Sequence, residues 1–366
     1  MRIHILTTRL NIHRGGSHHN CIAFVRALRK IGHEVSVHTY YSDGNDPPED
    51  IHIDSHDGER SPSFVSTYRR VADILHTVEH DADVFLLYGH FFLWGAGLYR
   101  KTGKVPVTVY LDNFLDSMGE AMRQRSLLSR LKHILWERAF GRSLVGRIDA
   151  LIAVSPYLRD VYIGSGFSHR TFVVVPNAFD FRQPHESVPH GGIHLLYAGR
   201  LTQEKGVDTL LAAASSLPCE LDWQLRIIGE GPMRDQIEKL AGLDDRISVE
   251  HWASGPQLSE AYGWADIFVH PALWPEPFGR TIVEAMHAGI PVIVPQKGAA
   301  MWLAEDAGFS FKNGDQRTLL ESLVSLMGDT HKRAILGESG KLRAAEFSSE
   351  KIAVQLATVL RSTNAK

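Results

Sequence analysis

The feature of this sequence that most constrains its fold is an alternation of strand-like and helix-like segments that occurs twice along the chain. Short runs rich in β-branched and aromatic residues alternate with longer segments whose apolar residues recur every three or four positions. Such alternation predicts an α/β protein with doubly wound parallel sheets, covered by helices on both faces. The strand-like runs are 2–8, 34–41, 84–88, 105–111, 150–155 and 172–176 in the first half, and 194–199, 223–229, 247–252, 266–271 and 290–295 in the second.

A polar stretch rich in Pro, Gly and His at 182–192 separates the two halves and indicates a linker. A chain of 366 residues also exceeds the usual size of one hydrophobic core. We therefore predict an N-terminal Rossmann-like domain at 1–182, a linker at 183–192, a C-terminal Rossmann-like domain at 193–345 and a C-terminal helix at 346–366 that has the option of crossing back to the N-terminal domain.

Two further segments receive a structural prediction. Residues 43–62 are rich in Asp, Pro, Gly and Ser and indicate an irregular excursion. After the last strand-like run we expect one helix at 319–327 before the terminal helix. Because doubly wound sheets bind ligands at the carboxyl ends of their strands, we expect the site in a cleft between the two domains, built from strand-end loops of both.

Composition excludes several classes of protein. The net charge of −3 at pH 7 gives no sign of a nucleic-acid binder. Cys21 and Cys219 stand far apart, which argues for a reducing compartment and against disulfides or a structural zinc site. No H-E-x-x-H motif occurs, and His52 and His56 are expected to be surface or loop residues rather than metal ligands. Without a signal-peptide pattern or an apolar stretch of roughly 20 residues, a cytoplasmic protein is expected.

The most informative segment for function is HPALWPEPFGRTIVEAMHAG at 270–289. Glu276 lies in a loop bracketed by prolines, and Glu284 lies in a segment with helical apolar spacing. A helix start offers unpaired backbone N–H groups that suit a phosphate, and carboxylates accept hydrogen bonds from sugar hydroxyls. The pair favours a pocket for a phosphorylated sugar; the alternative is two solvated acids near a helix start.

Other strand-end loops of the second half add charged and glycine residues. Arg200 and Lys205 in AGRLTQEKG precede a helix, where they are suited to neutralise a diphosphate. The GEGPMR loop contains Gly229 and Glu230 and either borders a nucleotide or is an ordinary turn. Trp252 follows the next strand and is either a platform for a base or a packed core residue.

The first half contributes weaker signals. Gly15 and Gly16 precede the first helix and permit close approach to an anion, although a plain turn is an alternative. His90 follows the strand at 84–88 and is predicted either to face the ligand or to be structural. Asp112 and Asn113 follow the strand at 105–111 and either contact the acceptor or form a plain turn, and His18 with His19 are also assigned to the acceptor.

These motifs resemble those of glycosyltransferase family 4, the retaining, nucleotide-sugar-dependent enzymes of the GT-B fold. The resemblance rests on Gly15-Gly16, His90, the stretch 154–180, AGRLTQEKG, GEGP and the E-x7-E at 276–284, and covers nearly the whole chain. One departure is PNAFD at 176–180, where the family often has PNGVD.

The resemblance implies roles for the matching positions. Glu276 would contact donor-sugar hydroxyls within the PEPFGR turn, together with backbone N–H groups of the residues that follow it, and Glu284 would hold the ribose. Arg200 and Lys205 would bind the diphosphate. The turn residues assigned to the donor are Pro277, Phe278, Gly279 and Arg280, while Gly16 would approach the phosphates and His90 the transferred sugar. The family needs no divalent metal and no further cofactor, and the D-x-D at 81–83, which precedes its strand, is expected away from the site.

The expected activity is transfer of a hexosyl unit from a nucleoside-diphosphate sugar to a saccharide or lipid-linked saccharide in surface glycan synthesis. Residues 121–147 are strongly basic with interleaved leucines, which fits either a helix on an anionic membrane, placing the protein peripherally on the inner face, or a solvated helix. A nucleotide-sugar epimerase of the same fold and a non-catalytic nucleotide-sugar-binding protein are the alternatives.

Overall fold

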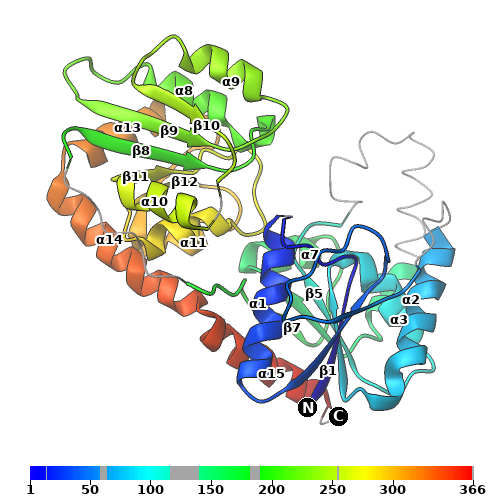
Figure 1. Ribbon diagram of the computed structural model, residues 1–366. Coiled ribbons are helices and arrows are strands. Elements are labelled where there is room, and N and C mark those ends of the chain that lie inside the picture. The colour runs from blue at the N-terminus through cyan, green and yellow to red at the C-terminus, as the bar shows by residue number, and fades with distance from the viewer. Residues whose placement is uncertain (14, 58–63, 116–139, 182–189, 254, 365–366) are drawn as a thin grey trace. The chain divides into compact units, whose positions relative to one another are not determined.

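The computed structural model describes all residues except 14, 58–63, 116–139, 182–189, 254 and 365–366. Most of the basic stretch 121–147 and of the predicted linker therefore lies outside the described residues. The chain forms two compact units (Figure 1). Unit 1 is Met1–Asp180 with Ser348–Lys366, and unit 2 is Phe181–Phe347.

Unit 1 has a parallel sheet in the order β3-β2-β1-β4-β5-β6-β7. The segment 43–62 is not entirely irregular, because its residues Ile53–Ser55 pair with β2 as an edge strand too short to give a periodic signal. The strands are β1 (Arg2–Thr7), β2 (Glu34–Thr39), β3 (Ile53–Ser55), β4 (Val84–Tyr88), β5 (Val107–Leu111), β6 (Ala150–Ala153) and β7 (Phe172–Val174). The described helices are α1 (Gly16–Lys30), α2 (Phe64–Val78), α3 (Leu93–Tyr99), α6 (Arg142–Val145), α7 (Pro156–Gly164) and α15 (Ser349–Asn364).

The last helix, α15, belongs to unit 1 although it follows unit 2 in sequence. It packs beside α1, as the red and blue helices of Figure 1 show. At the start of α15, the backbone N–H of Ser349 donates a hydrogen bond to the carbonyl of Phe179 (3.0 Å). Leu356 and Leu360 are fully buried, and Lys30 Nζ lies 2.6 Å from Glu350 Oε1. Burial of its apolar face therefore holds α15 on unit 1.

Unit 2 has a parallel sheet in the order β10-β9-β8-β11-β12-β13. Its strands are β8 (Ile193–Ala198), β9 (Trp223–Ile228), β10 (Ile247–Glu250), β11 (Ile267–Val269), β12 (Val292–Pro295) and β13 (Gly308–Phe311). Its helices are α8 (Val207–Ala214), α9 (Arg234–Ala241), α10 (Pro256–Trp264), α11 (Arg280–His287), α12 (Ala300–Ala304), α13 (Gln316–Met327) and α14 (Thr330–Ala344). In both units the sheet is parallel with helices packed against it, so the doubly wound α/β class is confirmed.

The sequence reading missed β13, α12 and α14. The long helix α14 contains Gly337 and Gly340, which weaken a helical prediction. For Gly337 the structure gives a reason, because a Cβ there would collide with the carbonyl oxygen of Gly289, two residues after the end of α11. This glycine thus lets α14 approach the end of α11 closely.

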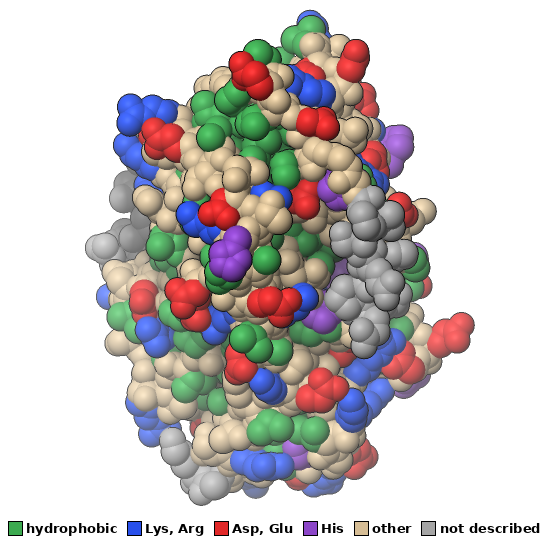
Figure 2. All heavy atoms as spheres, turned by 90° about the vertical axis from the view of Figure 1, so that its left-hand side faces the viewer, with side chains coloured by type: hydrophobic (Ala, Val, Ile, Leu, Met, Phe, Trp, Pro, Cys, Tyr) green, Lys and Arg blue, Asp and Glu red, His purple; other side chains and the backbone are tan. Residues whose placement is uncertain are grey.

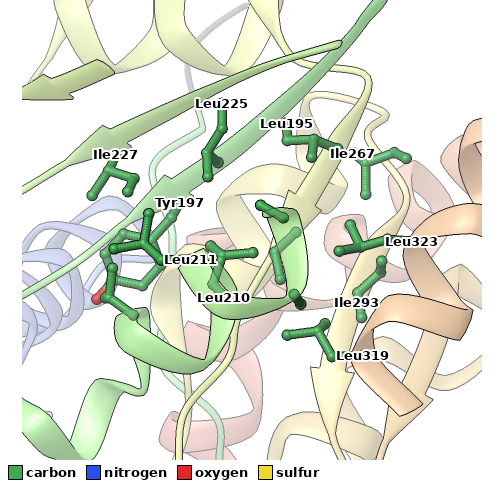
Figure 3. Close-up of a cluster of buried hydrophobic side chains, with 14 of the residues drawn as sticks. Leu195, Tyr197, Leu210, Leu211, Leu225, Ile227, Ile267, Ile293, Leu319 and Leu323 are labelled. Atoms are coloured by element: carbon green, nitrogen blue, oxygen red, sulfur yellow. The ribbon is translucent and has the colours of Figure 1, made fainter. Parts of the chain in front are cut away.

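The core of unit 2 lies between its sheet and the pair α8 and α13 (Figure 3). Leu195 and Leu225 on neighbouring strands point toward Leu210 and Leu211 of α8, and Leu319 and Leu323 of α13 close the same layer. Burying a leucine contributes about 1.5–3 kcal/mol. This layer fixes the strands whose carboxyl ends carry the candidate site.

Figure 2 shows basic and acidic side chains interspersed on the face in view, without a large field of one sign. Among the described helices, none combines the length and apolar character needed to cross a bilayer.

Unit 1 contains a hydrogen-bonded chain of histidines, in which His56 lies in the loop after β3, as expected, and is half-buried. His38 Nε2 lies 3.0 Å from His4 Nδ1, and His56 Nε2 lies 3.4 Å from His38 Nδ1. His4 Nε2 lies 3.3 Å from the carboxylate of Asp81. Three neutral rings, each protonated on Nε2, satisfy all of these contacts. Burial, together with smaller effects of the neighbouring His4 and His56, lowers the pKa of His38 to about 4.

We expect the free energy of unfolding of unit 1 to fall as the pH drops from about 6.5 to about 4. The pKa of His38 is lower in the folded state, so the unfolded chain binds more protons in this window and the stability present above it is lost. The loss amounts to about 3 kcal/mol from His38. Denaturant unfolding at a series of pH values measures it, with the exposed His331→Gln variant as a control that keeps the wild-type profile. A wild-type profile that stays flat over this window contradicts the neutral chain.

Candidate functional site

The carboxyl-terminal edge of the unit 2 sheet holds a buried carboxylate between two basic groups. Lys205 Nζ donates a short hydrogen bond to Glu276 Oε1, and His270 Nε2 lies 3.2 Å from the same oxygen. The side chains of Lys205 and Glu276 are 18% and 14% exposed, so the ion pair is largely shielded from water. Neither contact uses Oε2, which leaves that oxygen to accept a hydrogen bond from a ligand.

Lys205 and Glu276 meet because the loops after β8 and β11 are joined. The backbone N–H groups of Leu273 and Trp274 both donate to the carbonyl of Glu204, at 2.9 and 3.1 Å. Gly206 adopts a left-handed conformation with φ 65°, and a Cβ there would collide with the carbonyl of Pro271. A glycine is therefore required where the two loops cross.

A third loop supports Glu276 from behind. The backbone N–H of Ala299 donates to the carbonyl of Glu276 (3.0 Å). Gly298, with φ 86°, approaches so closely that a Cβ would lie 2.7 Å from the backbone nitrogen of Glu276. The backbone around this carboxylate is thus fixed on several sides.

The electrostatics of this cluster keep Glu276 ionised. Burial alone would raise the pKa of Glu276, but the charges of Lys205 and His270 outweigh burial and hold this pKa well below its ordinary value. The other ring nitrogen of His270, Nδ1, is buried and makes no hydrogen bond to a described residue. A buried imidazole of this kind suits a site that a ligand completes.

Glu284, the second acid of the pair, lies on α11 and is also held in place. The Tyr262 hydroxyl donates to Glu284 Oε2 at 3.1 Å, and Arg280 Nε lies 3.8 Å from Oε1. Gly279 is the residue before α11, with φ 135°. Pro277 lies in the preceding loop, and Phe278 is buried against Trp302 and Phe347. The PEPFGR turn therefore combines a packed anchor with two polar side chains on the helix.

The loops after β8, β9 and β10 place further predicted residues at the same edge. Arg200 is 66% exposed, and its Nη2 lies 3.8 Å from Glu204 Oε1. Glu230 Oε1 is hydrogen-bonded to His251 Nδ1 at 2.6 Å. A Cβ at Gly229 would collide with the carbonyl of Gly199, so the loops after β8 and β9 touch. Trp252 is 54% exposed, which rules out the alternative of a packed core residue.

In unit 1 the predicted residues also gather at strand ends. Gly15 is the residue before α1, and Gly16 begins that helix. Ser17 Oγ donates a short hydrogen bond to Asp112 after β5, and Asn20 Nδ2 donates to Tyr88 at 2.8 Å in the buried layer below. These contacts link the start of α1 to the ends of β4 and β5.

The other unit 1 candidates lie in the same region. His90 begins a short 3-10 turn after β4, preceded by Gly89 with φ 114°, and is half-buried. His18 and His19 lie in the first turn of α1, half-buried and exposed. Asn113 accepts a hydrogen bond from Tyr162 through its carbonyl (2.9 Å). The D-x-D motif lies at the opposite, amino-terminal end of β4, as expected, with Asp83 paired to Arg2 at 2.9 Å.

Sequence reasoning missed two residues of the unit 2 site. His270 directly follows β11, so the strand-end rule applied to His90 predicts it equally well. Tyr262 lies on α10, and no local pattern indicated that its hydroxyl reaches Glu284.

Two family models match successive parts of the chain. Residues 14–183 match the model described as Glycosyltransferase Family 4, and residues 180–343 match the model described as Glycosyl transferases group 1. The two matches together cover nearly all of both units.

Individual proteins are similar over different lengths. The chain is 31% identical over 159 residues to the sulfoquinovosyl transferase SQD2 of Arabidopsis thaliana, which covers 42% of this chain and 30% of that protein. The match to SQD2 thus spans less than a third of that relative. The chain is 28% identical over 315 residues to the GDP-mannose-dependent alpha-mannosyltransferase of Mycolicibacterium smegmatis, which covers 81% of this chain and 80% of that protein.

A solved structure shares the fold. Anabaena Alr3699/HepE in complex with UDP and glucose superposes with a TM-score of 0.74 at 20% identity, covering 98% of this chain and 99% of that one. At this identity the likeness concerns the fold alone, which is GT-B.

Proposed function

Because the chain belongs to glycosyltransferase family 4, we propose that it transfers a hexosyl unit from a nucleoside-diphosphate sugar to a hydroxyl group with retention of anomeric configuration. The observation that carries this proposal is the buried cluster of Lys205, Glu276 and His270 at the carboxyl ends of β8 and β11. It supplies a fixed cation for a phosphate and an ionised carboxylate for sugar hydroxyls in one place.

Each group has a distinct part in the proposed donor site. Lys205 and the exposed Arg200 bind the diphosphate, and Oε2 of Glu276 accepts hydrogen bonds from the sugar. Glu284, oriented by Tyr262, binds the ribose hydroxyls. Family resemblance alone extends the proposal to the remaining candidates, with Gly16 toward the phosphates and His90 toward the transferred sugar.

The chemistry follows from where charge develops. As the bond between the sugar and the β-phosphate breaks, negative charge grows on the departing diphosphate and positive charge on the sugar ring. Fixed cations at the phosphate stabilise the transition state more than the ground state. We propose departure and attack on the same face of the sugar, with the acceptor proton passing to the leaving phosphate, and without a metal ion.

The names of two similar proteins indicate which nucleotide sugars to test first as donors. The mycolicibacterial relative is named as GDP-mannose-dependent, and the Anabaena structure holds UDP and glucose. A panel of UDP- and GDP-sugars therefore tests the donor by the rise in unfolding temperature that a bound ligand produces. For the acceptor we propose a saccharide or lipid-linked saccharide of a surface glycan. Binding to anionic liposomes tests whether 121–147 also places the protein on a membrane.

Product analysis with the stabilising donor decides between the candidate activities. Transfer requires an acceptor and releases the nucleoside diphosphate. The new glycosidic linkage then has the same anomeric configuration, α or β, as the sugar in the donor. An epimerase converts the donor without any acceptor, and a binding protein leaves it unchanged. If no nucleotide sugar of the panel raises the unfolding temperature or is consumed, the proposed function is wrong.

Replacing Tyr262 with phenylalanine is expected to raise the KM for the donor about tenfold, with kcat nearly unchanged. The change removes the hydroxyl that orients Glu284, and a hydrogen bond to a charged group is worth about 1.5–3 kcal/mol. Tyr99→Phe is the matched control, because the Tyr99 hydroxyl donates to Glu79 at 2.6 Å in unit 1. Equal KM values in both variants would show that Tyr262 does not position a donor-binding group.

A further inference from the structure

The amino-terminal edge of the unit 2 sheet holds a second cluster of polar groups, which the proposed transfer reaction does not use. His194 is the second residue of β8, Asp266 directly precedes β11, and His190 lies in the segment before β8. One ring nitrogen of each histidine and one carboxylate oxygen of Asp266 lie within 4.8 Å of one another. Within the described part of the chain, this is the one group of three such side chains that converge in this way.

His194 is held in the orientation that metal-binding histidines require. Its ring stacks on Trp264 with centroids 4.0 Å apart, and its Nδ1 lies 3.0 Å from the Trp264 carbonyl. Donation of the Nδ1 proton to that carbonyl leaves the lone pair of the neutral ring on Nε2. A backbone carbonyl is a common outer partner of metal-ligating histidine, because it fixes the tautomer and the ring plane.

Asp266 is anchored in the same manner. Its Oδ2 accepts a hydrogen bond from the backbone N–H of His194 at 2.8 Å, and the same oxygen lies 3.7 Å from His190 Nε2. Neither contact uses Oδ1, so this oxygen is available to a cation. His194 is 5% exposed, whereas His190 is exposed at the surface, so the group is open on one side.

We propose that His190, His194 and Asp266 bind a divalent transition-metal ion of the Zn²⁺ class. Two imidazoles and one carboxylate are a ligand set typical of Zn²⁺, with water in the fourth position, whereas Mg²⁺ and Ca²⁺ prefer oxygen ligands throughout. Binding requires His190 to leave its stack on His194, whose centroid lies 3.5 Å away at 15° between ring planes. A coordinated ion lies in the plane of the imidazole ring, so two rings that are stacked in parallel planes cannot both coordinate the same ion.

The position of this site indicates a structural rather than a catalytic role. His194 and Arg200 lie at opposite ends of β8, about 20 Å apart at the rise of a β-strand. An ion at this edge would join the segment before β8 to the junction of α10 and β11. Its effect is therefore on the stability of unit 2 and on the anchoring of that segment.

The test uses the full chain without a polyhistidine tag, stripped with a chelator and titrated with Co²⁺ and then Zn²⁺. We expect one equivalent of Co²⁺ to produce the visible absorption of a low-symmetry, four- or five-coordinate site, and Zn²⁺ to displace it and raise the unfolding temperature. His190→Gln and Asp266→Asn should each lower the affinity at least about tenfold, since loss of even an outer partner typically costs 10–100-fold. Mg²⁺ should not raise the unfolding temperature.

His331→Gln is the matched control, because it removes an exposed histidine of unit 2 that lies on α14. It should bind Co²⁺ and Zn²⁺ as the wild type does. The unfolding temperatures without metal show whether each variant is folded. Affinity of His190→Gln and Asp266→Asn within twofold of the wild type, or the absence of saturable binding at one equivalent, would overturn the proposal. Neither readout depends on a nucleotide sugar.

Discussion

Replacing Arg200 with alanine is expected to lower kcat for sugar transfer by about 10²–10³-fold without loss of stability. Arg200 is 66% exposed, and its ion-pair contact to Glu204 is at 3.8 Å, so its removal disturbs little of the fold. In the proposed reaction its guanidinium stabilises charge that develops on the departing diphosphate. Initial-rate kinetics with the identified donor and denaturant unfolding measure the two effects.

Arg317→Ala is the control, because Arg317 is also exposed and pairs with a glutamate four residues later, at 3.0 Å. It should leave both kcat and stability unchanged. Near-wild-type transfer by Arg200→Ala would remove Arg200 from the diphosphate site.

Lys205→Ala is expected to lose a similar factor in kcat, but also about 3–5 kcal/mol of stability. The difference arises because Lys205 is largely shielded from water and its removal leaves the carboxylate of Glu276 without its counter-charge. The double variant Lys205→Met with Glu276→Gln removes both charges and should recover much of the stability while staying inactive. A double variant that recovers transfer would show that this ion pair serves the fold alone.

The second large effect concerns Glu276 and pH. Because its pKa is lowered in the folded state, Glu276 stabilises unit 2 above the unfolded pKa of about 4.3, and this stabilisation is lost as the pH falls below that value. At pH 7, Glu276→Gln should cost about 3–5 kcal/mol, since Lys205 is then buried without its partner.

Below about pH 4.3 the difference between the wild type and Glu276→Gln should shrink by up to about 1.4 kcal/mol per pH unit. Denaturant unfolding of both proteins across this range measures the effect. The effect of Glu276 develops mainly at lower pH than the effect of the histidine chain of unit 1, so the two effects on stability can be separated. Parallel pH profiles of the two proteins would contradict an ionised, paired Glu276.

The parts of the site that sequence could predict are those governed by local rules. Arg200, Lys205 and Glu276 each follow a strand-like run, and the carboxyl ends of parallel strands share one edge. That rule places them in one region, and the structure brings Lys205 and Glu276 into contact. It gives no distance between loops, which here depends on the glycine at 206 and on hydrogen bonds to the carbonyl of Glu204.

Other features depend on contacts between distant segments and had no local signal. Tyr262 contacts Glu284 only because α10 and α11 are brought together by the unit 2 fold. The helix α14 was missed because its glycines, of which Gly337 allows close packing at the end of α11, resemble helix breakers in sequence. His4 and His38 each looked like single residues in a strand, and only the parallel pairing of β1 with β2 aligns them.

The return of α15 to unit 1 has a consequence for biosynthesis. A nascent chain emerges from the ribosome with its amino end first, so residues 181–347 are complete before the helix that covers α1 has been made. Unit 2 is then able to fold during translation, whereas the first-made part of the chain must wait with an apolar surface uncovered until Ile352, Leu356 and Leu360 arrive. The part of unit 1 that is made before unit 2 is therefore completed only after unit 2.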